Sequence, residues 1–192
     1  MTREIERRAL PAAVLTVVTD GPSRIVGHAA LFDVLSQDLG GFRERIKPGA
    51  FSDSLEKDDI RALFNHDPNV ILGRNRSGTL HLSEDDRGLR IEIEPPDTQA
   101  ARDLMVSVGR GDITQMSFGF IVQPNGQVWE KDSEGRALRT LTAVRLFDIS
   151  PVVYPAYPDT AVAVRDLSLW RGDGKTIPLS VLRRGLELSL IE

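Results

Sequence analysis

The stretch "QMSFGFIV", residues 115–122, sets the pattern from which the fold class follows, because large apolar side chains occupy every second position. These positions are Met116, Phe118, Phe120 and Val122. An alternation with a period of two is typical of a β-strand. Ser117 lies between two bulky residues, so the strand would hold its hydroxyl on one defined face. Gly119 leaves room on that face for a backbone or a substrate.

Further runs with the composition of strands lie on both sides of this stretch. "GLRIEIE", residues 88–94, alternates apolar with charged residues, and the polar turn "SEDDRG" separates it from "TLHL". The other strand-like runs are 12–19, 24–32, 127–130, 136–144 and 145–153. Several short strands with few helices predict a mainly β (α+β) fold, and in particular a small closed β-barrel with helices around it.

Two segments have the pattern of helices instead. Residues 47–59 carry a proline near the start and an apolar pair four positions apart. Residues 97–111 give a stronger signal, because their apolar residues fall on one helical face. We expect Asp97 or Thr98 to cap the start of this helix and Gly109 to follow its end.

Composition limits the classes of protein that fit. The 192 residues are 41% hydrophobic, which is enough for one domain with a sizeable core. The net charge of −4 comes from interleaved signs, which does not fit a nucleic-acid-binding surface. The absence of cysteine excludes disulfides, thiolate metal sites and a cysteine nucleophile. The N-terminus is too charged for a signal peptide and no apolar run is long enough for a membrane span, so we expect a soluble intracellular protein.

The pattern changes near residue 165. Three prolines end the β-rich region: Pro151, Pro155 and Pro158. "WRGDGK", residues 170–175, is typical of a linker, and the leucines that follow it have roughly helical spacing. We therefore expect a domain at 1–165 and a linker and tail at 166–192 that docks elsewhere or is removed.

"ALFNHDPNVILGR", residues 62–74, contains one of only three histidines, His66, and three interpretations of it compete. In the first interpretation, His66 is a solvated turn residue, since turn-forming residues surround it. A second interpretation makes it a metal ligand with His81 and Asp67, although their spacing fits no common metal motif. In the third it is a catalytic base.

A catalytic base needs a nucleophile and an orienting acid. Ser117 is the candidate nucleophile, because a serine hydroxyl needs a histidine to activate it at neutral pH. Asp148 is the candidate acid, since it interrupts an apolar strand, where we expect it on the same face as Val144 and Leu146. The residues alone leave simpler roles open: Ser117 as a small buried filler and Asp148 as a cap or turn residue.

Several stretches, taken together, resemble one protein family. They are "GHAALFDV", "FRERIKPGAFSDSL", "ALFNHDPNVILGR", "GTLHLSEDDRGLRIEIEPPDTQAARDLMVSVGRGDITQMSFGF" and "LFDISPVVYPAYPDTAV". From about residue 24 to about 164 the chain resembles the prohead (capsid maturation) serine proteases of HK97-type tailed bacteriophages. The resemblance implies a small β-barrel related to the herpesvirus assembly proteases. It makes residues 1–165 the protease domain.

The resemblance also implies roles for particular residues. The histidine of "NHD", His66, corresponds to the base, and the serine of "SFGF", Ser117, to the nucleophile. The herpesvirus relatives have a second histidine after the serine, and no histidine here lies beyond His81. Asp148, where we expect glutamate in the commoner phage sequences, is the natural third member. No cofactor or metal is implied.

The family would also imply partners. Its members act inside the procapsid in the bacterial host cytoplasm, where they cut the scaffolding portion of the major capsid protein and commonly themselves. The portal is a further candidate partner, and a homodimer is left open because the herpesvirus relatives dimerise. Neither a membrane nor a nucleic acid is expected as a partner.

Arg74 and Arg145 are candidates for the oxyanion hole, with surface or structural ion pairs as the alternative for each, and backbone N–H groups near Ser117 are a further candidate. The competing function is a non-enzymatic capsid assembly protein with a protease-like barrel. The origin is equally open: phage, prophage or gene transfer agent.

Overall fold

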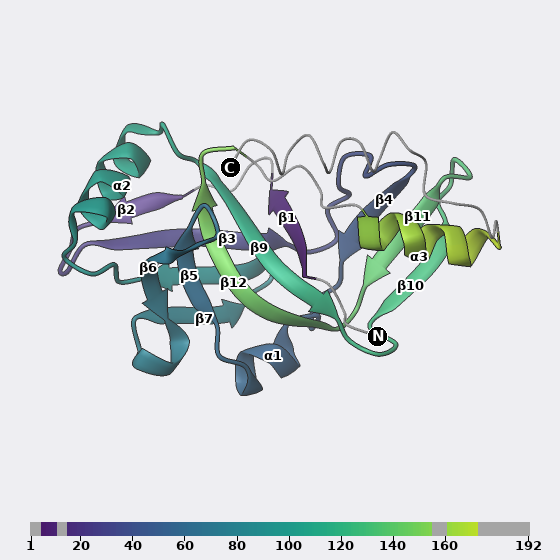
Figure 1. Ribbon diagram of the computed structural model, residues 1–192, viewed down its shortest axis with the longest axis horizontal. Coiled ribbons are helices and arrows are strands. Elements are labelled where there is room, and N and C mark those ends of the chain that lie inside the picture. Colours follow the sequence, from purple (N-terminus) through teal and green to yellow (C-terminus); the bar gives the residue numbers. More distant parts are fainter. Residues whose placement is uncertain (1–4, 11–14, 155–160, 173–192) are drawn as a thin grey trace.

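The computed structural model describes residues 5–10, 15–154 and 161–172, and their fold is mainly β with few helices, as the sequence predicts. The strands are β1 (Glu6–Leu10), β2 (Thr16–Val18), β3 (Arg24–Leu31), β4 (Phe42–Ile46), β5 (Arg61–Phe64), β6 (Asp67–Arg74), β7 (Leu80–Glu84), β8 (Gly88–Ile93), β9 (Gln115–Val122), β10 (Gln127–Lys131), β11 (Ala137–Leu141) and β12 (Val144–Val152). The helices are α1 (Ser52–Lys57), α2 (Gln99–Arg110) and α3 (Ala161–Arg171), with a short 3-10 turn, η1 (Asn75–Ser77). Figure 1 shows α2 and α3 at opposite ends of the molecule. None of the helices in these described segments is long and apolar enough to cross a membrane.

The largest sheet brings together three segments that are distant in the sequence. Its strand order is β1-β9-β12-β5-β6. Strand β9 is antiparallel to both β1 and β12, whereas β12 runs parallel to β5. Strands β5 and β6 form an antiparallel hairpin, so the turn that joins them lies near the end of β12.

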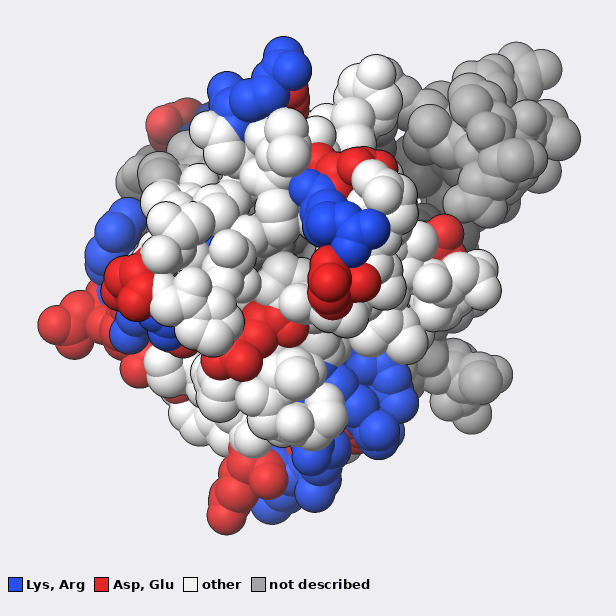
Figure 2. Space-filling model, turned by 90° about the vertical axis from the view of Figure 1, so that its left-hand side faces the viewer, with Lys and Arg blue, Asp and Glu red and all other residues white. Residues whose placement is uncertain are grey.

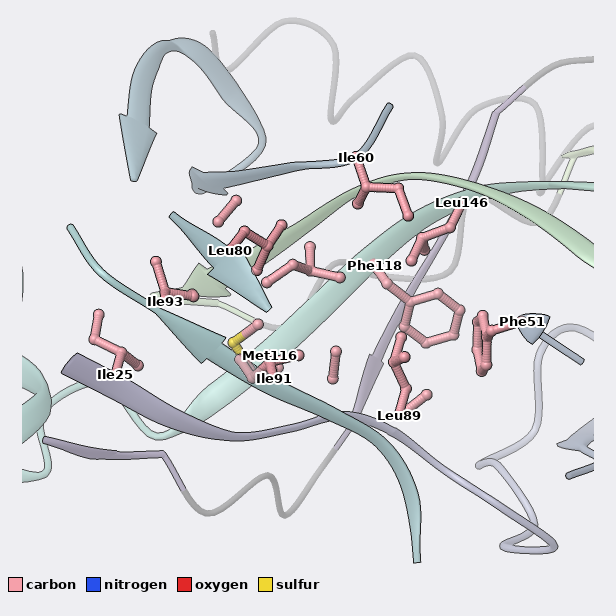
Figure 3. Close-up of a cluster of buried hydrophobic side chains, with 14 of the residues drawn as sticks. Ile25, Phe51, Ile60, Leu80, Leu89, Ile91, Ile93, Met116, Phe118 and Leu146 are labelled. Carbon is pink, nitrogen blue, oxygen red and sulfur yellow. The ribbon is translucent and has the colours of Figure 1, made fainter. Parts of the chain in front are cut away.

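One face of this sheet packs on a four-stranded sheet of order β2-β3-β8-β7. Figure 3 shows the core between them, where Met116 and Phe118 of β9 point toward Leu89 and Ile91 of β8. All four side chains are at most 1% exposed. Full burial of one such side chain contributes roughly 1.5–3 kcal/mol, so the apolar positions fix which face of β9 points inward. The alternation predicted for residues 115–122 is confirmed, and β9 has those bounds.

A third sheet, of order β10-β11-β4, makes a second, smaller core with α3. Leu167 of α3 is buried against Phe42 of β4. The ring of Trp129 on β10 lies between two others, with centroids 5.1 Å from Phe42 and 6.1 Å from Trp170. Helix α3 thus runs through the expected boundary at 165/166, which stays a prediction. The leucine-rich segment after residue 172 lies outside the described residues.

Four charged side chains are buried where β1 meets the small sheet. Both guanidinium NH groups of Arg139 donate to the carboxylate of Glu6, at 2.7 and 2.9 Å. Arg8 Nε donates to Glu44 Oε1 at 2.8 Å, and Arg139 Nη1 donates to Glu44 Oε2 at 3.0 Å. All four residues are at most 6% exposed. Strands β1 and β4 do not follow from the sequence pattern, because "ERRAL" and "FRERI" look like surface segments until their charges are paired.

Several finer expectations differ from the structure. In the described residues the strands form three sheets that are not joined into a closed ring, so the barrel stays a prediction. The second helix is capped by Thr98, whose hydroxyl accepts from the backbone N–H of Ala101 at 3.3 Å. It ends at Gly111, which has the left-handed φ of +81° required there, rather than at Gly109, which lies inside the helix. Helix α3 was not predicted, because prolines precede it.

Candidate active site

His66 lies in the two-residue turn of the β5–β6 hairpin. Asn65 and His66 have φ angles of +52° and +60°, the pattern of a type I′ turn, whose twist matches that of the flanking strands. Asparagine and histidine are both enriched among the few non-glycine residues that adopt this left-handed region, and such residues cluster at functional sites. The turn expected around His66 is present, but Asp67 and Pro68 belong to strand β6 rather than to the turn.

Hydrogen bonds from three positions hold this turn against the end of β12. The backbone N–H of Asn65 donates to the carbonyl of Pro151 at 3.0 Å, and Asn65 Oδ1 accepts from the backbone N–H of Val153 at 3.0 Å. The backbone N–H of His66 donates to Ser150 Oγ at 3.2 Å. Because these bonds satisfy the polar groups of the turn, they offset the strain of its positive φ angles.

Ser117 lies on the face of β9 that points away from the apolar core. It is between Phe118 and Met116 in the strand, and its ladder neighbours are Ala9 on β1 and Ser150 on β12. The residue has no exposed surface. The prediction that flanking apolar residues hold the Ser117 hydroxyl on one face agrees with this arrangement.

A β-bulge brings Asp148 to the same face. The register between β12 and β9 shifts between Leu146 and Asp148, so that Leu146 lies opposite Phe120 and Asp148 opposite Gly119. Leu146 therefore points into the core, while Asp148 points to the side of Ser117. The expectation that Asp148 shares a face with Leu146 is wrong, because the extra residue in the bulge reverses the alternation.

The side chains of Ser117, His66 and Asp148 form one hydrogen-bonded chain. His66 Nε2 lies 2.7 Å from Ser117 Oγ, and His66 Nδ1 lies 2.5 Å from Asp148 Oδ2. The histidine is 51 residues from the serine and 82 from the aspartate in the sequence, so tertiary structure alone brings them together. The side chains of His66 and Asp148 are 6% and 13% exposed, which keeps bulk water away from most of these hydrogen-bonded side chains.

Gly119 makes room for the aspartate. A Cβ atom at this position would lie 2.5 Å from Asp148 Oδ1, closer than such atoms approach. The space expected beside Ser117 is thus filled by the carboxylate of Asp148.

The hydrogen bonds define which atoms can carry protons. A carboxylate oxygen can only accept, so the proton between His66 and Asp148 belongs to Nδ1 of the ring. The Nε2 atom of a neutral ring is then free to accept the Ser117 hydroxyl proton. A hydroxyl activated in this way can attack an electrophilic carbonyl carbon.

The other candidates from the sequence lie elsewhere. His81 is on β7 opposite Glu92, in a different sheet from His66, and Asp67 accepts from Asn69 in its own strand. Within the described ranges, no group of three histidine, aspartate or glutamate residues is placed so that it could hold a metal ion.

Both arginines that the sequence offers for the oxyanion hole are bound to carboxylates. Arg74 donates twice to Asp59, at 2.7 Å each, and Arg145 donates to Asp58 at 3.0 Å. On the face shown in Figure 2, basic and acidic side chains are likewise interspersed, with neither sign gathered into a patch.

One residue of this site, Ser150, was not predicted from the sequence. It lies two positions after Asp148, and that spacing in a strand was the available signal, since it places both side chains on one face.

The fold and the site together define a class: a mainly β protein whose largest sheet carries serine, histidine and aspartate in the hydrogen-bonded order of the serine peptidases. Residues 12–171 of the 192 match the family described as caudovirus prohead serine protease, and the chain belongs to this family. No curated protein and no solved structure matches it. The family resemblance drawn from the sequence is confirmed, while the relation to herpesvirus proteases stays a prediction. Membership implies a serine protease of capsid maturation with a capsid protein as substrate.

Proposed function

We propose that this protein is an endopeptidase that removes the scaffolding portion of the major capsid protein inside the procapsid, and that it also cleaves itself. Ser117 is the nucleophile, His66 the general base and acid, and Asp148 the residue that orients the histidine. The observation that carries the proposal is the unbroken chain from Ser117 Oγ through the His66 ring to Asp148 Oδ2. Family membership supplies the substrate class.

Acylation follows from this geometry. Ser117 Oγ forms a bond to the carbonyl carbon of the scissile peptide while its proton passes to His66 Nε2. The carbonyl π-electrons move to oxygen and give a tetrahedral oxyanion. When the oxyanion collapses, the C–N bond breaks and His66 gives its proton to the leaving nitrogen. Asp148 holds the ring in the required tautomer and stabilises the imidazolium that forms in between.

Deacylation reuses the same groups. Water gives a proton to His66 Nε2 as its oxygen attacks the ester carbon. Collapse of the second oxyanion breaks the bond to Ser117 Oγ, which takes the proton back. Because Ser117 has no exposed surface, substrate binding has to uncover it before the first step.

Ser117→Ala tests the proposal. The chain is produced with the capsid precursor, and both are analysed by mass spectrometry. We expect the wild type to yield shortened capsid protein and its own cleavage products, and Ser117→Ala to yield neither while it keeps the wild-type melting temperature. Cleavage of the precursor at wild-type levels by Ser117→Ala would rule out this nucleophile.

A fluorophosphonate probe separates the protease from the non-enzymatic assembly protein. The probe forms a covalent bond with an activated serine, so we expect labelling of the wild type at Ser117 and none of Ser117→Ala. A folded wild-type chain that assembles with capsid protein and is never labelled would instead favour the assembly role.

A further inference from the structure

Ser150 is buried beside the three residues of the candidate active site. It lies on β12 two positions after Asp148 and directly opposite Ser117 in the β9–β12 ladder. Like Ser117 it has no exposed surface. Its side chain therefore belongs to the interior of the site.

The Ser150 hydroxyl bonds to both partners of the His66–Asp148 pair. Its proton is donated to Asp148 Oδ2 at 3.0 Å, the oxygen that also contacts His66 Nδ1. Its oxygen accepts the backbone N–H of His66 at 3.2 Å and lies 3.4 Å from the ring atom Nδ1. One hydroxyl thus fixes the aspartate carboxylate and the turn that carries the histidine.

We infer that Ser150 is a positioning residue that sets the geometry of the His66–Asp148 pair; this inference rests on the proposed function. Without the hydroxyl, Asp148 Oδ2 would lose one of its two donors and the carboxylate could rotate. The backbone N–H of His66 would also lose its acceptor, in a turn whose positive φ angles need such support. Both changes would move His66 Nε2 relative to Ser117 Oγ.

A purely structural role is the alternative, and the chain contains a matched comparison for it. Ser54 is also fully buried, donates to the carboxylate of Asp58 at 2.8 Å and accepts the backbone N–H of Leu146 at 2.8 Å. Ser54 supports the same strand as Ser150, β12, but its hydrogen bonds go to none of the three site residues. The two serines have the same kinds of bond, so they should contribute similarly to stability.

The experiment measures fluorophosphonate labelling of the full chain, with the maximal labelling rate and the half-saturating probe concentration determined separately. We expect Ser150→Ala to lower the maximal rate about 10- to 100-fold, the size of effect caused by small misplacements of reacting groups. The half-saturating concentration should stay unchanged, because the Ser150 hydroxyl bonds to Asp148 and to the backbone of His66 and not to Ser117, where the probe reacts. Ser54→Ala should lower the melting temperature by about as much as Ser150→Ala does. It should leave the maximal labelling rate within about twofold of the wild type, since the geometry of the three site residues is retained.

Ser150→Cys keeps the volume of the side chain but donates weakly, so we expect a rate between those of the wild type and Ser150→Ala. Wild-type labelling by a folded Ser150→Ala or Ser150→Cys would overturn the inference. Equal loss of rate in Ser54→Ala and Ser150→Ala would overturn it too, because the effect would then follow stability. Failure of the proposed function looks different: the wild type itself would resist labelling.

Discussion

At the scale of single residues, the position of Asp148 depends on a neighbour without a side chain. The carboxylate reaches His66 across Gly119, where a Cβ atom would lie 2.5 Å from Asp148 Oδ1. We expect Gly119→Ala to displace the carboxylate and to reduce precursor cleavage on the order of 10²-fold, the loss expected for a displacement of about 1 Å. Cleavage of the capsid precursor over time measures this.

Gly109→Ala is the control for that substitution. Gly109 lies inside α2, and nothing is within 4 Å of an added Cβ atom. Alanine is favoured over glycine in a helix by about 1 kcal/mol, so this variant should be slightly more stable and fully active. Wild-type cleavage by Gly119→Ala would mean that the carboxylate has another route to the histidine.

The tautomer of His66 gives a second prediction at this scale. Asp148→Asn keeps the size of the side chain but presents an NH2 group to Nδ1, which favours the ring with its proton on Nε2. That ring cannot accept from Ser117, so we expect fluorophosphonate labelling to fall on the order of 10⁴-fold. Asp85→Asn is the control, because Asp85 contacts the ring of His28, which lies on β3 of the four-stranded sheet, at 2.8 Å. Similar losses in both variants would point to a general effect on folding.

At the scale of elements, regular strands could be predicted and irregular ones could not. Every second side chain of β9 is apolar because these side chains are buried in the core. The bounds of β9 and the face of Ser117 therefore follow from the sequence. The bulge that turns Asp148 toward His66 arises only from pairing with β9, so no local pattern reveals it. The same holds for β1 and β4, whose charges are buried only because they meet each other.

The β5–β6 turn yields a prediction that separates strain from hydrogen bonding. Asn65 combines a φ of +52° with a side-chain bond to Val153. Asn65→Gly removes the bond but adopts this φ freely, whereas Asn65→Ala removes the bond and adds strain of about 1–2 kcal/mol. We expect urea denaturation to show a larger loss of unfolding free energy for alanine than for glycine. Equal losses would show that the positive φ contributes no strain.

At the scale of the whole molecule, a buried ionic cluster joins the large sheet to the small one. It comprises Glu6 and Arg8 on β1, Glu44 on β4 and Arg139 on β11. Strand β1 also pairs with β9, the strand of Ser117. The cluster therefore connects the sheet that carries the candidate active site to the α3 end of the molecule (Figure 1). A cluster of this kind is sensitive to the loss of any one charge, because the remaining charges stay buried without compensation.

The pKa of Glu6 describes the pH dependence of this cluster. Burial opposes ionisation of the carboxyl, but the hydrogen bonds and charges of Arg139 and Arg8 outweigh it and hold the pKa below its ordinary value of 4.5. A carboxyl whose pKa is lower in the folded than in the unfolded state stabilises the fold fully at any pH above its unfolded-state pKa. That contribution is lost as the pH falls through the folded-state pKa. We therefore expect the contribution of Glu6 to the wild-type unfolding free energy to be constant from neutral pH down to about 5 and to decline below it.

Arg139→Met tests the cluster as a unit. Removal of the guanidinium leaves Glu6 and Glu44 buried with less compensation, which should cost about 3–5 kcal/mol at neutral pH in urea denaturation. Burial would then raise the Glu6 pKa, so acid should protonate the carboxyl more readily and the gap from the wild type should narrow toward pH 5. Adding Glu6→Gln to Arg139→Met should recover part of the loss at neutral pH for the same reason. Arg145→Met, which removes an exposed ion pair to Asp58, should change little. A gap that stays constant with pH, with no recovery in the double variant, would show that Arg139 acts through packing rather than charge.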